Sequence, residues 1–426
     1  MKFLKVFAIV LWITCTANAD GGSNPAAASK SSSAASPASG APAPSVTVTI
    51  NGQPKVYPQL DIVPDTNDPI VQKWMSQYDF SKVPDLPCSN GGVVNHDQPS
   101  CDNKTKIDPN QGSWTCQKYV APDDIQACPT TGNWGVTYDD GPSAATPMLL
   151  DTLEQCNLKA TFFVIGSRAI SNPEVLLRAH KQGHHIAVHT WSHPALTSLS
   201  NAQVVAELGW TMQAIKDIIG NTPIYYRPPY GDTDNRVRAI TRAMGLITVL
   251  WLPDFDSNDW TLLSTPPQPI SYVISTFDGW MKKFPTMSTG FIVLEHDLYN
   301  ETVKAAIEVV KLAVKIQGLN MTTVAQCVGD SKPYLELGGS PNLVVNVANG
   351  TNSTTKSVNT TTATLPASAS AATSSPSTPS GKPVASSAPS ASNNTNTNTN
   401  PSTSSGNSLV ITILPVISIL FALLFA

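Results

Sequence analysis

The stretch "HIAVHTWSHP", residues 185–194, joins a short apolar run to two histidines four positions apart. The run "HIAVHT" is apolar on both faces, which is typical of a buried strand in a parallel sheet. If His189 and His193 shared one helical turn, they would lie on the same face and could bind one metal ion. An ordinary turn rich in imidazole has the same spacing, so the pair alone does not distinguish a metal site from a structural role.

The same apolar pattern recurs in "WGVTY" (134–138), "ATFFVIG" (160–166), "LITVLW" (246–251) and "FIVLEH" (291–296). Between these runs lie amphipathic stretches that predict helices over 201–220, ended by Gly220, and 301–317, ended by Gly318. Repeated strand-helix alternation predicts an α/β fold with a parallel sheet or barrel. Chemistry in such folds gathers at the carboxyl ends of the strands.

Acidic and imidazole side chains follow several of these predicted strands. Asp139 and Asp140 come directly after the first strand, and His296 ends the last. One of the two carboxylates could complete a three-ligand site with the histidine pair, leaving coordination positions open for water and substrate. The other carboxylate could then serve as a general base and His296 as a general acid. The alternative for the "DDGP" segment is a plain turn, because Asp, Gly and Pro all favour turns.

Two further residues could support this chemistry. Asp259 offers a carboxylate that could hold the His296 imidazole protonated. Arg227 precedes two prolines that stiffen its loop, and its permanent charge could steer a neighbouring carboxylate. A rigid loop carrying a surface arginine is the alternative for that segment.

Five segments in this order, "TYDD", "HTWSH", "RPPY", "DSNDW" and "IVLEHD", resemble the five motifs of polysaccharide deacetylases, the NodB-homology domain of carbohydrate esterase family four. The resemblance covers residues 130–330. It implies a distorted (β/α) barrel and metal-dependent removal of acetyl groups from the N-acetylglucosamine units of chitin. One departure is Tyr138, which stands where the family usually has Phe.

Matching these motifs residue by residue gives each side chain an expected role. The resemblance implies that a divalent metal, Zn²⁺ or Co²⁺, is bound by Asp140, His189 and His193. It makes Asp139 the general base, oriented by Arg227, and His296 the general acid, tethered by Asp259. The substrate-binding residues that it implies are Tyr230, through its backbone N–H, and Trp260 and Leu294, which would line a pocket for the acetyl methyl group.

The two ends of the chain have a different composition from its centre. Residues 1–19 predict a signal peptide, 20–45 a low-complexity linker, 331–408 a disordered, glycosylated Ser/Thr-rich stalk, and 409–426 a signal for a GPI lipid anchor. A tail-like membrane span is the alternative for the last segment. We therefore expect a secreted protein at the outer face of the plasma membrane and in the cell wall. The N-glycosylation sequons are at Asn103, Asn300, Asn320, Asn349, Asn352, Asn359 and Asn393.

Six of the seven cysteines lie outside the predicted signal peptide and suit disulfides in an oxidising compartment. Four of them fall in or at the end of an N-terminal extension, residues 46–129, which the family core lacks. We expect Cys156 to pair with Cys327, since they lie near the first helix and the last strand of the domain, and the other four to pair among themselves. The extension could cap the barrel, contact chitin or act as a spacer.

The net charge of −4 gives no reason to expect a nucleic-acid partner. The stalk and the apolar end make the chain resemble GPI-anchored fungal chitin deacetylases, with chitin and other cell-wall glycans as partners. Two other functions remain open at this point. One is an esterase acting on acetyl-xylan or another wall polysaccharide, and the other is a non-catalytic, sugar-binding wall mannoprotein. A purely structural mannoprotein would explain the stalk but not the buried strands that end in acids and histidines.

Overall fold

The computed structural model describes residues 45–99, 101, 108 and 110–340. The predicted signal peptide, nearly all of the linker, most of the stalk and the anchor signal lie outside these residues, as do Asn103, Asn349, Asn352, Asn359 and Asn393. Asn300 and Asn320 are exposed, as expected for glycosylation sequons. Within the described part of the chain, no helix is long and apolar enough to cross a membrane.

Two parallel sheets form the centre of the fold. The larger has the strand order β4 (Thr137–Asp139), β5 (Thr161–Val164), β6 (His185–Val188), β7 (Tyr225–Tyr226) and β8 (Ile247–Thr248). The smaller has the order β10 (Asn320–Thr322), β3 (Asn133–Gly135) and β9 (Phe291–Ile292). Parallel bridges from Asp139 to His296 and from Asp256 to Leu294 link the two sheets. The strands therefore make a distorted ring, which confirms the predicted α/β barrel.

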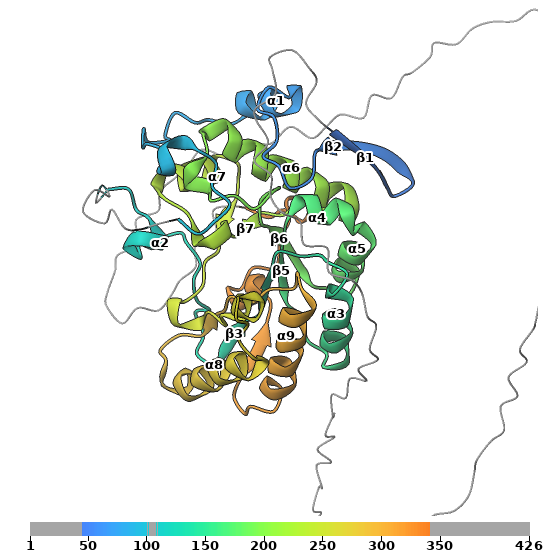
Figure 1. The fold of residues 1–426 in the computed structure, drawn as a ribbon, viewed down its shortest axis with the longest axis vertical. Helices are drawn as coiled ribbons and strands as arrows, with labels where there is room; N and C mark the ends of the chain where they lie inside the picture. Colours follow the sequence, from blue (N-terminus) through green and yellow to red (C-terminus); the bar gives the residue numbers. More distant parts are fainter. Residues whose placement is uncertain (1–44, 100, 102–107, 109, 341–426) are drawn as a thin grey trace, which may run out of the picture. The chain divides into compact units, whose positions relative to one another are not determined.

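Helices surround these strands, as Figure 1 shows. The α-helices of the barrel are α3 (Thr146–Gln155), α4 (Gly166–Ser171), α5 (Pro173–Lys181), α6 (Asn201–Ile219), α7 (Asn235–Ala243), α8 (Ile270–Lys283), α9 (Asn300–Ala313) and α10 (Val324–Cys327). Short 3₁₀ helices are η1 (Ser89–Gly92), η3 (Leu196–Ser198), η4 (Pro229–Gly231), η5 (Pro253–Phe255), η6 (Asp259–Leu263), η7 (Phe284–Thr286) and η8 (Leu335–Leu337).

The predicted helix over 201–220 corresponds to α6. Ser200 and Gln203 form a capping box at its start, and Gly220 ends it in the left-handed conformation with φ 82°. The helix predicted over 301–317 is shorter, because α9 ends at Ala313. Beyond it the backbone tightens into turns, with the N–H of Ile316 donating to the carbonyl of Ala313.

The strands that the apolar runs predict are buried on both faces. Every residue of β5 and β6 is buried between the helices and the barrel interior. On the smaller sheet, the Trp134 ring stacks on Phe291 with 5.7 Å between centroids. Strand β10, which is only 3 residues long, was not predicted from the sequence. Short strands carry too few residues for a periodicity to be visible.

The segment after β6 is a loop, so the helical turn considered for His189 and His193 is wrong. Thr190 and His193 both have positive φ, 66° and 61°, which no helix allows. The loop nonetheless brings the two imidazoles together, with 5.0 Å between ring centroids.

The N-terminal extension packs on α6 and on this loop (Figure 1). It contains the hairpin β1 (Ser45–Ile50) and β2 (Gln53–Pro58), then α1 (Pro69–Gln77) and α2 (Trp114–Gln117). Tyr57 is buried and stacks on Trp191, and Trp74 meets Trp210 edge to face. The Nε1 of Trp191 also donates to the carbonyl of Gln59. All described residues belong to one unit of the chain, so the extension is not a detached spacer.

The predicted disulfide between Cys156 and Cys327 is wrong. Cys327 is bonded to Cys128, with 5.2 Å between their Cα atoms. Cys128 precedes β3 and Cys327 follows β10, and these two strands are neighbours in the sheet, whereas Cys156 ends α3. Cys101 pairs with Cys116, and Cys88 carries a free thiol. The expectation that the other four cysteines pair among themselves is therefore also wrong.

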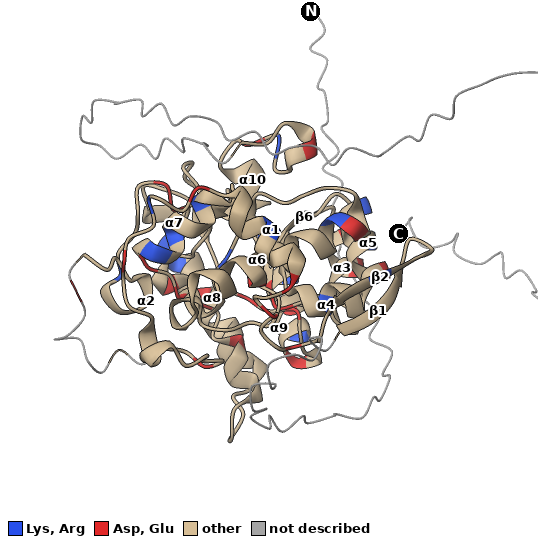
Figure 2. Ribbon diagram, turned by 90° about the horizontal axis from the view of Figure 1, so that it is seen from above, with Lys and Arg blue, Asp and Glu red and all other residues tan. Residues whose placement is uncertain are grey.

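Charged residues of both signs are interspersed over the described part of the molecule (Figure 2). The arginines of α7 illustrate this, since Arg238 pairs with Asp124 at 2.8 Å and Arg242 pairs with Asp123. These ion pairs join α7 to the end of the extension.

Candidate metal and catalytic site

Asp140, His189 and His193 come together at the carboxyl ends of β4 and β6, with their ligand atoms all within 4.8 Å of one another. The Nε2 atoms of His189 and His193 lie 3.4 Å and 3.2 Å from Oδ1 of Asp140. Asp140 directly follows β4, and the two histidines belong to the loop after β6. The barrel thus joins residues that lie 49 and 53 positions apart in the chain.

The chemistry of these three side chains fits a divalent metal ion. Oδ1 of Asp140 is buried and accepts no hydrogen bond within the described part of the chain. Nδ1 of His189 lies 2.8 Å from the carbonyl oxygen of Arg227. Because that oxygen can only accept, Nδ1 carries the proton and Nε2 presents a lone pair. Although burial alone would raise the pKa of Asp140, His193 and His189 hold it well below its usual range when their imidazoles are protonated, so the carboxylate form is favoured.

The backbone around these ligands adopts sparsely populated conformations. Asp140, Thr190, His193 and Tyr230 all have positive φ, between 58° and 78°. Such conformations in residues other than glycine cost on the order of 1–3 kcal/mol each and cluster at functional sites. The surrounding structure must therefore hold these loops in place.

Glu207 of α6 accepts hydrogen bonds from the histidine loop, the segment after β6 that carries His189 and His193. Its role was not predicted from the sequence. Its Oε2 accepts the backbone N–H groups of Trp191 and Ser192 at 2.6 Å and 2.8 Å, and its Oε1 accepts the Ser192 hydroxyl at 2.6 Å. The side chain is fully buried, and burial raises its pKa to about 7. A signal was available, since Glu207 interrupts the apolar stripe of Val204 and Leu208.

Asp297 holds the turn that follows Asp139 and Asp140. It was also not predicted as a functional residue. It accepts the backbone N–H of Gly141 at 3.0 Å and the Thr146 hydroxyl at 2.6 Å. A Cβ at position 141 would lie 2.2 Å from Oδ2 of Asp297, so only glycine fits there. Burial raises the pKa of Asp297 to about 7.

Asp139 forms a buried ion pair with Arg227. Nη1 of Arg227 donates to Oδ1 of Asp139 at 2.9 Å and to the Thr137 hydroxyl at 3.0 Å. The guanidinium also lies over the Phe163 ring, 4.3 Å from its centroid. Oδ2 of Asp139 is left 4.0 Å from Nε2 of His189, on the side of the three-residue cluster.

His296 is held beside Asp139 by the bridge that links the two sheets. Its Nδ1 lies 2.6 Å from Oδ1 of Asp259, and its backbone N–H donates to Oδ2 of the same carboxylate at 2.8 Å. Burial alone would lower the pKa of His296, but Asp259 raises it well above its usual range. The imidazole can therefore hold a proton on Nε2 at neutral pH.

The three predicted substrate-binding residues lie at the same end of the barrel. Tyr230 is half-buried in η4, and its hydroxyl contacts His193 Nδ1 at 3.2 Å. Trp260 follows Asp259 and is 53% exposed, whereas Leu294, two residues before His296, is buried. Their roles toward a substrate remain predictions.

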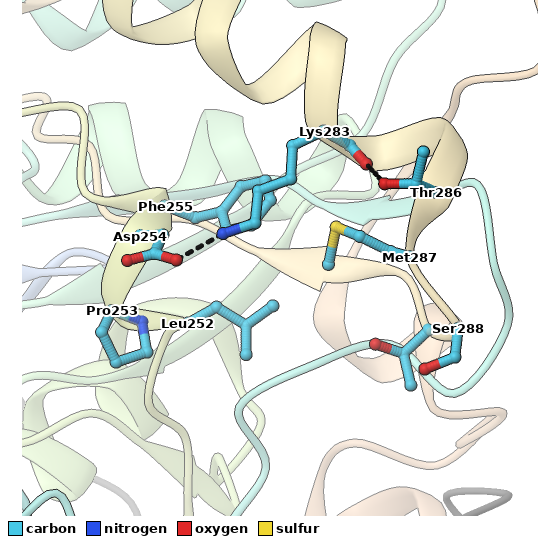
Figure 3. A pocket seen from close by; sticks show the side chains of 9 residues that line it. Leu252, Pro253, Asp254, Phe255, Lys283, Thr286, Met287 and Ser288 are labelled. Atoms are coloured by element: carbon cyan, nitrogen blue, oxygen red, sulfur yellow. Dashed lines mark hydrogen bonds and ion pairs between the residues drawn. The ribbon is translucent and has the colours of Figure 1, made fainter.

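A separate cleft lies between η5 and the turn after α8 (Figure 3). Lys283 pairs with Asp254 across it, above Met287 and Leu252. None of the predicted site residues lines this cleft.

Residues 126–249 match the family model described as polysaccharide deacetylase. Chitin deacetylase 1 of Cryptococcus neoformans var. grubii serotype A is 40% identical over 331 residues, which cover 72% of this chain and 68% of that protein. Chitin deacetylase 2 of Saccharomyces cerevisiae is 38% identical over 252 residues, covering 59% of this chain and 72% of that protein. Among solved structures, a chitin deacetylase from Colletotrichum lindemuthianum is 29% identical with a TM-score of 0.44, covering 50% of this chain and 96% of that one.

Proposed function

Because the chain belongs to the polysaccharide deacetylase family, we propose that it hydrolyses the N-acetyl groups of N-acetylglucosamine units in chitin, giving chitosan and acetate. It is a hydrolase acting on N-acetyl amides. The observation that carries the proposal is the buried Oδ1 of Asp140, which has no other partner among the described residues and faces the Nε2 atoms of two histidines. Beside it lie Asp139 and His296, a carboxylate and an imidazole suited to acid–base chemistry.

Asp140, His189 and His193 would hold a divalent ion, Zn²⁺ or Co²⁺. When bound, such an ion supplies a Lewis acid that polarises the acetyl carbonyl and lowers the pKa of water. Asp139 takes the proton from the attacking water, and its ion pair with Arg227 fixes which carboxylate oxygen is free to do so. The backbone N–H of Tyr230 donates to the oxyanion that develops on the carbonyl.

His296 would supply the proton that completes the reaction. Because Asp259 favours its protonated form, the imidazolium can give a proton to the amide nitrogen as the C–N bond breaks. Acetate and a free amine on the sugar are the products. Trp260 and Leu294 would surround the acetyl methyl group.

Acetate release tests this function and separates it from its alternatives. We expect acetate from chitin oligomers, loss of that activity with a chelator, and recovery with Zn²⁺ or Co²⁺. His189→Ala should be inactive, whereas His180→Ala, which removes an imidazole packed on Tyr334, should retain activity. Release from acetyl-xylan but not from chitin would make the protein an esterase of another wall polysaccharide. No release from either would indicate a sugar-binding protein.

We place this activity outside the cytosol, in the cell wall or at the cell surface. The disulfides Cys101–Cys116 and Cys128–Cys327 support an oxidising compartment. Attachment to the outer face of the plasma membrane by a GPI lipid anchor is the finer part of the proposal, and it rests on the apolar run 409–426, outside the described residues. Release of the protein from membranes by a GPI-specific phospholipase would test it, and a protein that this enzyme leaves bound would contradict it.

A further inference from the structure

We infer that the N-terminal extension is part of the metal site, because its backbone carbonyl at His96 orients the ligand His193 through the hydroxyl of Tyr230. The inference rests on the proposed metal site and concerns a positioning group rather than a catalytic one. Tyr230 lies between the two partners, since its hydroxyl donates to the His96 carbonyl and lies 3.2 Å from Nδ1 of His193.

The direction of these hydrogen bonds follows from the chemistry of the three groups. A carbonyl oxygen can only accept, so the one proton of the Tyr230 hydroxyl points to His96. The hydroxyl oxygen can then only accept from His193. Nδ1 of His193 must therefore carry the imidazole proton, which leaves a lone pair on Nε2, the atom 3.2 Å from Oδ1 of Asp140. The extension thus selects the tautomer that a metal ligand requires.

The ring of Tyr230 also restrains the imidazole sterically. It meets the His193 ring edge to face, with 4.7 Å between centroids. Tyr230 and His193 both have positive φ, so neither loop is in a conformation that it would adopt unaided. The contact from the extension, through the His96 carbonyl, restrains the two loops in one conformation.

The carbonyl of His96 is itself fixed in place by Asn95. Oδ1 of Asn95 accepts the N–H of Asp97 at 3.0 Å, which turns the backbone around His96. The backbone of Asn95 is bonded to the histidine loop and to η3. Its carbonyl accepts the N–H of Ala195 at 2.7 Å, and the N–H of Asn95 donates to the Ser198 hydroxyl at 3.1 Å. The extension is therefore anchored two residues beyond His193, on the same loop that supplies the metal ligand.

The corresponding contact of His189 shows why this arrangement is unusual. Nδ1–H of His189 donates a hydrogen bond to the backbone carbonyl of Arg227, which belongs to the barrel itself. The equivalent acceptor for His193 is reached only through Tyr230 and lies in the extension, 134 positions before Tyr230 in the chain. One ligand is oriented by the barrel and the other by the extension.

The test measures the affinity of the full-length protein for Zn²⁺ by competition with a chromophoric chelator. Tyr230→Phe keeps the ring and removes the hydroxyl, and we expect its Zn²⁺ affinity to fall about 10- to 100-fold, the usual effect of removing such a partner. Asn95→Ala should lower the affinity less, because it loosens the turn without removing the carbonyl. Thermal unfolding and circular dichroism of each metal-free variant establish that it is folded.

A double-mutant cycle separates orientation from a general loss of stability. If the carbonyl acts through the hydroxyl, Asn95→Ala should cause no further loss of Zn²⁺ affinity once Tyr230 is Phe. The matched controls are Tyr225→Phe, which removes a hydroxyl bonded to Asp330 at 2.7 Å, and Asn51→Ala, which removes a contact from the extension to Asp217 at 2.8 Å. Both should leave Zn²⁺ affinity unchanged even if they lower the unfolding temperature.

Unchanged Zn²⁺ affinity in a folded Tyr230→Phe variant would overturn the inference, as would losses that add in the double variant. A reduced affinity in both controls would also overturn it, because the effect would then be one of stability. The proposed function is tested separately by acetate release from the unaltered protein, which can succeed while the inference fails.

Discussion

Asp259 binds His296 twice, with Oδ1 2.6 Å from the imidazole Nδ1 and Oδ2 accepting the backbone N–H of the same residue at 2.8 Å. The two contacts fix both the position and the charge of the ring. Because the carboxylate is buried and faces Nδ1, it favours the imidazolium form and keeps the remaining proton on Nε2. The proposed general acid thus depends on a neighbour that need not touch the substrate.

The first prediction follows from this pair. Asp259 raises the pKa of His296 well above its usual range, although burial opposes the shift. Asp259→Asn should therefore lower that pKa and move the alkaline limb of the kcat–pH profile to lower pH, because the acid loses its proton sooner. A general acid is protonated below its pKa and loses its function as the pH rises through that pKa.

Measuring kcat from about pH 5 to 10 at saturating metal and substrate checks this result, because this range includes the usual histidine pKa and extends well above it. Asp254→Asn is the matched control, because this exposed carboxylate pairs with Lys283 at the separate cleft between η5 and the turn after α8. An alkaline limb that stays in place in a folded Asp259→Asn variant would rule out the proposed coupling.

The second prediction concerns Glu207 and the pH dependence of stability. Burial raises its pKa from 4.5 to about 7, so the folded protein binds this proton more tightly than the unfolded chain. The stabilisation is complete below pH 4.5 and is lost as the pH rises to about 7, a change on the order of 3 kcal/mol. Glu207→Gln does not titrate and should lose this part of the pH dependence.

The measurement is the free energy of unfolding by denaturant at several pH values, with a chelator present so that metal binding does not contribute. Glu308→Gln, which changes an exposed residue of α9, should follow the unaltered protein. If Glu207→Gln also follows it across the whole range, the buried carboxyl does not titrate as described.

The fold could be predicted because its strands are buried on both faces and end in polar residues. The conformation of the loops and the order of the strands in the sheets could not be predicted from the sequence. The spacing of His189 and His193 is the same in a helix and in a loop, so it predicted their proximity for the wrong reason. The partner of Cys327 depends on β10 lying beside β3, and β10 has the sequence "NMT", whose single apolar residue gives no strand signal.

Contacts between distant segments were the other limit. His96 and Tyr230 lie 134 positions apart, and nothing in the composition around His96 distinguishes it from an exposed loop. Glu207 was visible as a charge within an apolar stripe, but a pattern that shows a buried acid does not show what the acid binds. The catalytic and metal-binding assignments came from motif resemblance, which supplies residue identities without geometry, and they remain proposals.

The third prediction tests the corrected disulfide. Digestion without reduction should yield a peptide pair containing Cys128 and Cys327, and thiol labelling should modify Cys88. The double variant Cys128→Ser/Cys327→Ser should lose about 2–5 kcal/mol of stability, because the bond closes a loop of 199 residues. Cys88→Ser is the control and should be much closer to neutral. A peptide linking Cys156 to Cys327 would restore the original assignment.

The last prediction separates the adjacent acids Asp139 and Asp140. Asp140→Ala removes one of the three proposed ligands and should lose bound metal together with activity. Asp139→Asn is nearly isosteric and should keep the metal but lower kcat by roughly 10²-fold or more, the scale of general base catalysis. It also leaves the buried Arg227 without its charge partner, which should cost about 3–5 kcal/mol of stability.

Metal content by elemental analysis, acetate-release rates and unfolding temperatures of the two variants distinguish these roles. His296→Ala should resemble Asp139→Asn in metal content and turnover; it leaves the pair of Asp139 and Arg227 intact and instead removes the partner of the buried Asp259. If Asp139→Asn loses the metal while folded and Asp140→Ala keeps it, the two assignments are reversed. If both keep it at full occupancy, the two histidines must find their third ligand elsewhere, and the unpartnered Oδ1 of Asp140 would need another explanation.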